Sequence, residues 1–379
     1  MRVCLIYDCL YPYTVGGGER WYRALAERLA REGHEVTYLT LRQWDEGAKP
    51  DVPGVDVIAV GPRLELYFEG RRRIGPALRF GRGVLRHLLR EGRRYDVVHC
   101  ASTPFFALLA AGLARRRGHY RLLVDWIEVW TLDYWREYLG RFKGTVAWIV
   151  QRLATRLGER AFCFSRLHER RLRAEGFRGP IDVVGVYAGP LDRPDPEPAE
   201  QIVVFVGRHI PEKGVLAVPP ALASARETLP ELRAEILGDG PLRGEVQRSV
   251  RELDLDGVVS VPGFVSEERR LESVRRALCV ASPSTREGYG LVVVEAAALG
   301  TPSVVVDSPD NAALELVEDG VNGVVARSAE PGELSAAIVH VHEAGDALRT
   351  STAGWFERNA RRLSLETSFE TVIRAYAPG

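Results

Sequence analysis

Short apolar runs alternate with amphipathic stretches along this chain, and this alternation restricts the fold more than any other feature. In the first half, the apolar runs 3–7 and 36–41 flank residues 19–32, whose apolar side chains recur at helical spacing. The side chains on that helical face are Tyr22, Leu25, Ala26 and Leu29. Strands that alternate with helices in this way build a parallel, doubly wound sheet, so the sequence predicts an α/β fold.

A proline-rich segment divides the chain. Its prolines stand at Pro190, Pro194, Pro196 and Pro198. Because proline fixes φ and lacks an N–H, this segment is neither helix nor central strand. A second series of strands and helices begins at residues 202–206. The sequence therefore predicts two Rossmann-like domains, residues 1–190 and 201–363, joined by a linker at 191–200, with a ligand in the cleft between them.

Length and charge agree with two different domains. The chain has 379 residues, enough for two hydrophobic cores of ordinary size. Its formal net charge is zero, but residues up to Asp195 include 33 basic and 23 acidic side chains, and the rest include 18 and 28. A basic first half can steer an anionic ligand or contact an anionic membrane. A general preference for arginine in this chain, which has only three lysines, is the simpler explanation of the basic first half.

Cysteine usage and the first residues bear on location. Five cysteines lie mostly in or beside apolar runs without a C-x-x-C pair, as buried thiols in a reducing compartment do. The chain begins directly in a strand pattern, with no signal-peptide pattern and no run of about 18 apolar residues. We expect a cytoplasmic protein whose membrane association, if any, is peripheral and at the inner membrane face.

Residues 283–300 contain the strongest candidate for a binding site. An apolar run, a loop rich in Ser, Thr and Gly, and an apolar helix that opens near Gly290 follow one another there. The first amides of such a helix, those of Gly290, Leu291 and Val292, lack internal partners and lie at the positive end of its dipole. The sequence therefore predicts a phosphate site, which Gly288 and Gly290 allow a ligand to approach closely.

Two carboxylates flank this predicted anion site. Five helical steps from Gly290 to Glu295 advance roughly 7 Å, which is about the length of a diphosphate. A sugar nucleotide could lie along the helix with Glu295 at the ribose hydroxyls and Glu287 at the sugar. The alternative is that Glu287 caps the helix and Glu295 lies on the surface. An apolar neighbourhood fits that alternative poorly, because burying an unpartnered charge is expensive.

Two cations follow the first strand of the second half, in V-G-R-H-I-P-E-K-G. Arg208 offers a planar fork of donors and Lys213 a compact point charge, and both suit a diphosphate. Solvated loop charge is the alternative. Lys213 is, however, the only lysine after Lys143.

The segment E-G-Y-G-L-V-V-V-E resembles the E-x7-E signature of the retaining GT-B glycosyltransferases of family 4. G-R-x-x-x-x-K-G is similar to the diphosphate motif of that family. The glycine triplet after the first strand, G-D-G-P at 238–241 and G-F-V-S at 263–266, the last near the nucleotide base, also match family landmarks. The resemblance implies a GT-B fold whose C-terminal helix, residues 364–379, crosses back to the first domain. It implies a donor site made of Gly16, Gly17, Gly18, Gly207, Arg208, Lys213, Val265, Glu287, Gly288, Tyr289, Gly290, Leu291, Val292 and Glu295.

A tryptophan-rich segment, from Asp125 to Trp148, is the candidate acceptor site. Four of the seven tryptophans lie there, together with acidic residues that argue against a dry core. Family members often carry a histidine after this strand, where this chain has Asp125. We predict that Asp125, Trp126 and Glu128 contact the acceptor, with Asp125 in a catalytic position.

The segment 70–95 combines some ten arginines with regularly spaced leucines. One interpretation of this pattern is a solvated helix face whose arginine stems cover apolar surface. The sharper hypothesis is a basic helix that docks on anionic lipid. Nucleic acid is a poorer partner, because no aromatic side chains are interleaved with the basic ones as in single-strand binders.

No metal site is predicted. Residues 254–256 spell D-x-D, but they follow a helix and precede Gly257, so we interpret them as a turn. We expect no cofactor other than the nucleoside-diphosphate sugar itself as donor substrate.

Taken with the resemblance, these residues predict a metal-independent transferase that moves a hexose-type sugar from a UDP- or GDP-linked donor. The acceptor would be a glycan, a lipid-linked sugar or a small molecule, in cell-surface polysaccharide or glycolipid synthesis. Arg208 and Lys213 would stabilise the leaving diphosphate and Glu287 would position the sugar. The resemblance implies front-face attack with retention. Alternatives are a phosphorylase with lysine-bound pyridoxal phosphate, a sugar-nucleotide 2-epimerase, and a non-catalytic sugar-nucleotide binding protein.

Overall fold

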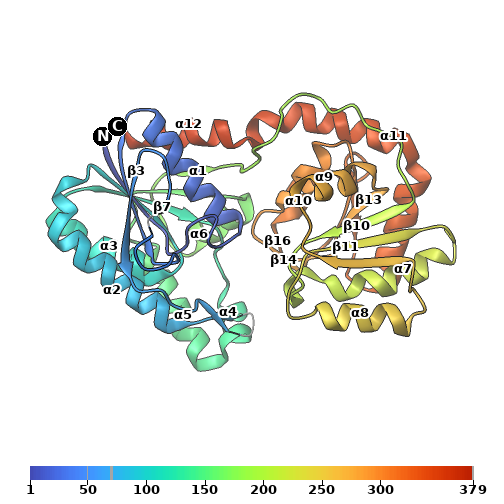
Figure 1. Ribbon diagram of the computed structural model, residues 1–379, viewed down its shortest axis with the longest axis horizontal. Helices are drawn as coiled ribbons and strands as arrows, with labels where there is room; N and C mark the ends of the chain where they lie inside the picture. Colours follow the sequence, from blue (N-terminus) through green and yellow to red (C-terminus); the bar gives the residue numbers. More distant parts are fainter. Residues whose placement is uncertain (49, 69–70, 378–379) are drawn as a thin grey trace. The chain divides into compact units, whose positions relative to one another are not determined.

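The computed structural model describes residues 1–48, 50–68 and 71–377. Gly70 of the predicted basic segment and the last two residues of the predicted crossover helix lie outside the described residues. The chain divides into two compact units. Unit 1 contains Met1–Val186 and the segment from Glu366, and unit 2 contains Tyr187–Leu365. The chain thus leaves unit 1 once and returns to it through its last helix, as the family resemblance implied (Figure 1).

Unit 1 is built on a seven-stranded parallel sheet in the order β3-β2-β1-β6-β7-β8-β9. The strands are β1 (Arg2–Ile6), β2 (Glu35–Leu41), β3 (Val55–Gly61), β6 (Val97–Ala101), β7 (Arg121–Trp126), β8 (Arg160–Cys163) and β9 (Ile181–Val183). Strands β4 (Tyr67–Phe68) and β5 (Arg71–Arg72) form a separate antiparallel pair. The central strands are apolar on both faces because helices cover both sides of a parallel sheet.

The helices of unit 1 are α1 (Gly17–Arg31), α2 (Ile74–Glu91), α3 (Phe105–Gly118), α4 (Leu132–Leu139), α5 (Arg141–Ala154), α6 (Arg166–Ala174) and α12 (Leu365–Tyr376). A short 3₁₀ turn, η1 (Gly92–Arg94), follows α2. The predicted first helix corresponds to α1, whose Tyr22, Leu25, Ala26 and Leu29 are buried as expected.

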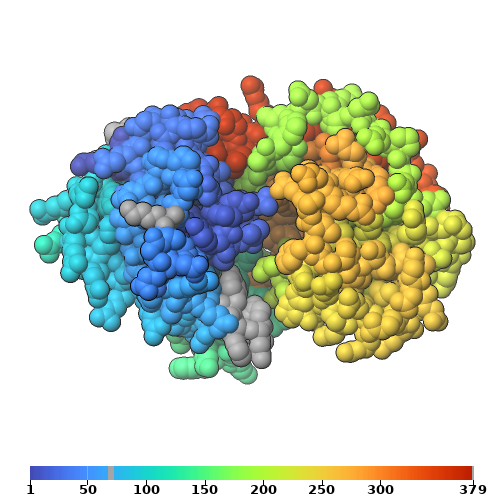
Figure 2. Space-filling model, in the orientation of Figure 1, coloured from blue at the N-terminus to red at the C-terminus, as the bar shows by residue number. Residues whose placement is uncertain are grey.

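The predicted basic segment contains α2. This part of the chain is light blue in Figure 2 and lies at the surface. Its apolar face packs inward, because Phe80, Val84 and Leu88 are fully buried. Helix α3 lies against it. The arginines of α2 are on its outer side, so this helix has the ordinary amphipathic arrangement of a solvated helix.

Unit 2 is built on a six-stranded parallel sheet in the order β12-β11-β10-β13-β15-β17. The strands are β10 (Ile202–Val206), β11 (Arg233–Leu237), β12 (Val259–Gly263), β13 (Cys279–Ser282), β15 (Ser303–Val306) and β17 (Gly323–Ala326), with a separate pair of β14 (Arg286–Glu287) and β16 (Asp310–Asn311). The two parallel sheets with their covering helices confirm the predicted α/β class.

The helices of unit 2 are α7 (Val218–Arg226), α8 (Arg243–Glu252), α9 (Glu267–Arg276), α10 (Leu291–Ala297) and α11 (Pro331–Leu363), with 3₁₀ turns η2 (Pro211–Lys213), η3 (Val215–Ala217) and η4 (Ala312–Leu316). Helix α11 is interrupted at Gly345, where φ is +54° and ψ is −143°. The predicted D-x-D turn follows α8, and Asp254 there has a φ of +53°.

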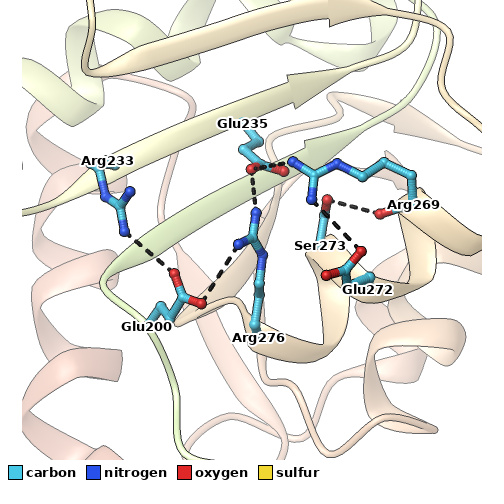
Figure 3. A network of polar contacts seen from close by, with 7 residues as sticks. All are labelled: Glu200, Arg233, Glu235, Arg269, Glu272, Ser273 and Arg276. Atoms are coloured by element: carbon cyan, nitrogen blue, oxygen red, sulfur yellow. Dashed lines mark hydrogen bonds and ion pairs between the residues drawn. The ribbon is translucent and has the colours of Figure 1, made fainter.

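A network of ion pairs positions α9 on the sheet of unit 2 (Figure 3). The carboxylate of Glu235, in β11, accepts hydrogen bonds from Arg269 at 3.0 Å and Arg276 at 2.6 Å. Arg276 also lies 3.6 Å from Glu200, which pairs with Arg233. Isolated exposed pairs stabilise little, but this set joins α9 to β11 and to the segment that precedes β10. Because Arg269 is held on Glu235, the side chain of the residue that follows it, Arg270, points toward α10.

Among the described residues, no helix combines the length and apolar character needed to cross a bilayer.

Candidate functional site

Two loops at the carboxyl ends of neighbouring strands meet in unit 2. Strands β10 and β13 are paired, so the loops that follow them, 207–214 and 283–290, lie at the same edge of the sheet. The Thr285 N–H donates to the carbonyl of Glu212 at 3.1 Å. A Cβ on Gly214 would lie 2.2 Å from the Pro283 carbonyl oxygen, and φ at Gly214 is +64°. Only glycine at 214 allows these two loops to pack this closely.

The loop contact brings two predicted donor-site residues together. The ammonium group of Lys213, at the end of η2, forms an ion pair with the carboxylate of Glu287 in β14. Both side chains are largely buried. Strand β14 is held by its pairing with β16. Arg208, on the same loop as Lys213, has an exposed side chain. The predicted diphosphate cations and the predicted sugar carboxylate thus share one edge of unit 2.

Helix α10 begins beside this ion pair, close to the predicted position. Its N-cap is Gly290, with a φ of +101°, and its first internal hydrogen bond runs from the Val293 N–H to the Gly290 carbonyl at 3.0 Å. The amides of Gly290, Leu291 and Val292 precede that bond. A Cβ on Gly290 would lie 2.7 Å from Ala313 Cβ, so both backbone conformation and space require glycine there. Gly288 is buried and Tyr289 packs beside the core of unit 2.

The second carboxylate of the motif, Glu295, forms a two-point ion pair with Arg270 of α9. Both side chains are largely buried, and one of the two contacts, Arg270 Nη2 to Glu295 Oε1, is 3.1 Å. This pair supplies the charged partner that a carboxylate in an apolar neighbourhood requires. Sequence reasoning missed Arg270, because nothing in E-E-R-R-L-E-S-V-R-R distinguishes it from its neighbouring arginines.

A buried histidine lies between Arg208 and the rest of the loop. The His209 N–H donates to the Asp239 carbonyl at 2.9 Å, and its own carbonyl accepts from the Leu242 N–H at 3.1 Å. The ring is fully buried, and neither ring nitrogen has a hydrogen-bond partner within the described residues. Burial lowers the pKa of His209. Sequence reasoning missed this residue too.

Two further predicted donor residues lie at the same edge of unit 2. The Gly207 N–H donates to the Leu237 carbonyl at 3.0 Å, and a Cβ on Gly238 would lie 1.9 Å from the Gly207 carbonyl oxygen. Val265 follows β12 and packs partly against a core cluster of β10 and α10. Its neighbour Phe264 is exposed.

The glycine triplet of unit 1 has a local structural reason. Gly16 caps α1, and Gly17 and Gly18 form its first turn, whereas the sequence suggested a loop before the helix. A Cβ on Gly16 would lie 2.4 Å from Glu19 Oε2, and a Cβ on Gly18 would lie 2.7 Å from Tyr7 Oη. The first and third glycines therefore accommodate neighbouring side chains, and their contact with a donor stays a prediction.

Asp125 lies in the core of unit 1, and its predicted contact with an acceptor stays a prediction. The side chain is fully buried. One carboxylate oxygen lies 2.8 Å from His99 Nε2, and the other accepts from Trp21 Nε1 at 2.7 Å. Because a buried carboxylate must be paired, these contacts explain Asp125 as part of the core. Trp126 is buried as well, and its acceptor contact also stays a prediction.

Glu128 is the predicted acceptor residue that lies nearer the surface. It is partly buried, and its carboxylate accepts from Trp130 Nε1 at 2.6 Å. The aromatic rings that follow it pack on one another and belong to Trp130, Tyr134, Trp135 and Tyr138. An acceptor role for Glu128 remains a prediction.

Metal-ligating side chains do not converge within the described residues, where no group of three or more His, Cys, Asp or Glu side chains could hold an ion. The five cysteines are buried and unpaired.

Two family models match the chain. "Glycosyl transferases group 1" matches residues 192–352, and "Glycosyl transferase 4-like domain" matches residues 16–187. The first match lies within unit 2, the second covers unit 1 from residue 16 and ends one residue beyond its boundary, and together they extend over most of the chain.

Curated relatives and solved structures agree with these matches. The chain is 31% identical to an alpha-D-kanosaminyltransferase of Streptomyces kanamyceticus over 36% of its own length, an alignment that spans 35% of that relative. It is 28% identical to a phosphatidyl-myo-inositol mannosyltransferase of Mycolicibacterium smegmatis, over 96% of this chain and 89% of the relative. Its fold is similar to that of a sucrose-phosphate synthase from Thermosynechococcus elongatus, with a TM-score of 0.79, 19% identity, and 99% and 98% of the two chains covered.

Both sheets, both motif-bearing loops of unit 2 and both family models lead to the same assignment: the chain belongs to the group 1 glycosyl transferases, which are family-4 glycosyltransferases of the GT-B fold.

Proposed function

We propose that this chain transfers a hexose-type sugar from a UDP- or GDP-linked donor to a glycan, lipid-linked or small-molecule acceptor, with retention at the anomeric carbon. The observation that carries the proposal is the ion pair of Lys213 with Glu287, which lies beside Arg208 and the first amides of α10. Cations and amides suit the diphosphate of a donor, and a carboxylate suits the hydroxyl groups of its sugar.

Donor binding would exchange partners within this site. A diphosphate placed at Lys213 competes with Glu287 for the ammonium group. Glu287 is then free to accept hydrogen bonds from the hydroxyl groups of the sugar. Glu295 faces the ribose hydroxyls in this arrangement, and Arg270 keeps its carboxylate in position.

The chemical step separates charge at the leaving group. The bond from the anomeric carbon to the diphosphate oxygen breaks, and negative charge collects on the departing phosphate. Arg208, Lys213 and the amides of residues 290–292 are the groups that would stabilise this charge. The acceptor oxygen attacks from the face that the phosphate leaves, and its proton passes to a phosphate oxygen.

The acceptor class is proposed from the full-length relative. A phosphatidyl-myo-inositol mannosyltransferase, by its name, acts on a phospholipid. Together with the basic first half of this chain, that likeness supports an acceptor in cell-surface polysaccharide or glycolipid synthesis. We place the protein in the cytoplasm, in peripheral contact with the anionic inner face of a membrane.

The first test is thermal stabilisation by a panel of nucleotide-sugars, with and without EDTA. At about 100 times its dissociation constant, a bound donor adds about 2.7 kcal/mol to the free energy of unfolding. We expect one donor to stabilise the wild type in EDTA, and Glu295→Ala to lose most of that shift. If no donor raises the melting temperature of the wild type, the donor assignment of the E-x7-E segment is wrong.

Substitutions of two lysines distinguish a specific role of Lys213 in the site from a general effect of lost positive charge. With the donor so identified, Lys213→Gln should lower kcat/KM for transfer or donor hydrolysis by about 100-fold or more, because a preorganised cation at the leaving phosphate is lost. Lys143→Gln, an equal loss of charge on α5, should leave the rate of donor hydrolysis unchanged. Equal losses in the two variants would refute the role of Lys213. Proton NMR of the first product formed tests whether the anomeric configuration is retained.

A further inference from the structure

Helix α5 in unit 1 exposes its apolar face, whereas an ordinary surface helix buries that face against the protein. Its outward face consists of Phe142, Val146, Ile149 and Leu153, all of which are exposed. Their spacing of four, three and four residues places them on one stripe. Phe142 is 81% exposed and Leu153 is 49% exposed. Apolar side chains that form a continuous exposed stripe mark a binding surface more often than single exposed ones do.

The inward face of α5 is small and polar. Its buried residues are Gly144, Gln151 and Ala154. The Gln151 side chain accepts from the Trp130 N–H and from Trp135 Nε1, each at 3.1 Å, and donates to the Trp130 carbonyl at 2.8 Å. These bonds fix the rotation of α5 about its axis. The apolar stripe therefore faces outward because a hydrogen-bonded glutamine holds the opposite side.

Helix α4 packs on α5 without covering this stripe. A Cβ on Gly144 would lie 2.2 Å from the Trp135 carbonyl oxygen, so α4 approaches α5 on its inward side. The two helices join at Gly140, whose φ is +83°. The ring cluster of Trp130, Tyr134, Trp135 and Tyr138, all partly exposed, flanks α5. Tryptophan and tyrosine rings of this kind are enriched where one end of a side chain is apolar and the other is wet.

Positive charge borders the stripe. Helix α5 carries Arg141, Lys143 and Arg152, all exposed, and contains no acidic residue. The exposed acids of the hairpin, Asp133 and Glu137, lie on α4. An apolar stripe with cations on both flanks is complementary to a bilayer surface that has acyl chains below and anionic headgroups above.

We propose that the outward face of α5 is the surface through which this protein docks on an anionic membrane. This inference rests on the proposed membrane contact and assigns it to α5 in place of α2. Helix α2 is also cationic, but its main apolar face is buried against unit 1, and its large exposed apolar side chains are Ile74, Leu78 and Leu89, on the same outer side as its arginines.

The test uses the full-length protein and sedimentation with vesicles of phosphatidylcholine, with or without phosphatidylglycerol. Leu153 and Leu78 are both 49% exposed leucines on cationic helices, so they form a matched pair. Leu153→Ser should weaken binding to phosphatidylglycerol vesicles about fivefold, because about half of a leucine side chain no longer leaves water. Phe142→Ser should weaken it about tenfold or more. Leu78→Ser should have no effect.

Charge is tested separately. Arg141→Gln combined with Lys143→Gln should weaken binding to phosphatidylglycerol vesicles by about tenfold or more, and added salt should weaken wild-type binding as well. Vesicles of phosphatidylcholine alone should bind the wild type poorly. Melts followed by tryptophan fluorescence, to which unit 1 contributes six of the seven tryptophans, show whether each variant is folded. Donor-induced thermal stabilisation, a property of unit 2, should be unchanged in every variant.

Three results would overturn the assignment to α5. One is a loss in Leu78→Ser equal to or larger than that in Leu153→Ser, which would assign docking to α2. Another is failure of the wild type to bind phosphatidylglycerol vesicles at all. The third is a concentration-dependent dimer, abolished by Phe142→Ser, without vesicle binding. In each case, the proposed transferase function is still supported if the donor raises the melting temperature. If no donor raises the melting temperature of the wild type, the proposed function fails, whatever the vesicle result.

Discussion

At the scale of single residues, the buried imidazole of His209 in the candidate site destabilises the folded state when it is protonated. Its ring is buried in the loop between β10 and η2, 6.1 Å from the ring of Phe205, and neither nitrogen has a hydrogen-bond partner among the residues that the structure describes. Protonation would place an unpaired charge there, which is why burial lowers the pKa of His209 below its usual value. The loop that carries Arg208 and Lys213 is therefore built around a neutral imidazole.

This residue makes the stability of unit 2 depend on pH. The unfolded chain titrates its histidines near about 6.5, and His209 in the folded protein titrates lower. The unfolded state thus binds more protons as pH falls below about 6.5, and the folded state loses stability there. We expect His209→Leu to show a smaller drop in melting temperature between pH 7 and pH 5 than the wild type. Identical drops in circular-dichroism melts would contradict this account.

At the scale of elements, α12 is fastened to unit 1 through buried polar contacts. The hydroxyl of Tyr376 lies 2.6 Å from His99 Nδ1, and His99 Nε2 pairs with Asp125. Both ring nitrogens of His99 are therefore partnered inside unit 1. Ser368 exchanges hydrogen bonds with the backbone of Gly185 at 2.8 Å. The last helix is thus joined to the centre of the first sheet.

Removing the Tyr376 hydroxyl should loosen unit 1. Tyr376→Phe leaves Nδ1 of His99 buried without a partner, which costs about 1–3 kcal/mol. For a unit of this size, that corresponds to a fall of about 2–4 °C in melting temperature per kcal/mol. Six of the seven tryptophans lie in unit 1, so tryptophan fluorescence follows its unfolding. The control is Tyr13→Phe at an exposed tyrosine, and an equal fall in both variants would refute the role of the buried contact.

At the scale of the whole molecule, unit 2 contains the charged groups of the proposed donor site. The core clusters around its sheet consist only of residues between Tyr187 and Leu363. The ion pairs of Lys213 with Glu287 and of Arg270 with Glu295 also lie within it. A unit with its own core and its own site is expected to fold alone.

A fragment of residues 187–365 tests this autonomy. We expect it to unfold cooperatively, with the buried Trp355 as its single fluorescent reporter, and to bind the nucleoside diphosphate of the donor within about tenfold of the full-chain affinity, a difference of about 1.4 kcal/mol. Calorimetric titration measures the affinity. Glu295→Ala in the same fragment should bind much more weakly. A soluble, folded fragment that ignores the nucleotide would show that residues outside unit 2 complete the site.

The sequence by itself determined the class, the division and the main motifs of this protein. Continuous apolar runs and helical hydrophobic patterns reflect which strands and faces are buried, and glycine and proline act on the local backbone, so both are visible without tertiary contacts. The two α/β units and the helix that starts at Gly290 were therefore predictable. Lys213 and Glu287 were both predicted, although their direct ion pair was not.

Tertiary structure alone decided where individual polar side chains point. Asp125 looks like a site residue in sequence, but its carboxylate is directed into the core by His99 and Trp21, which are distant in the chain. Arg270 became recognisable only when α9 was placed beside α10. The outward apolar face of α5 could not be predicted, because periodicity shows that a helix has an apolar side but not whether the protein or another phase covers it.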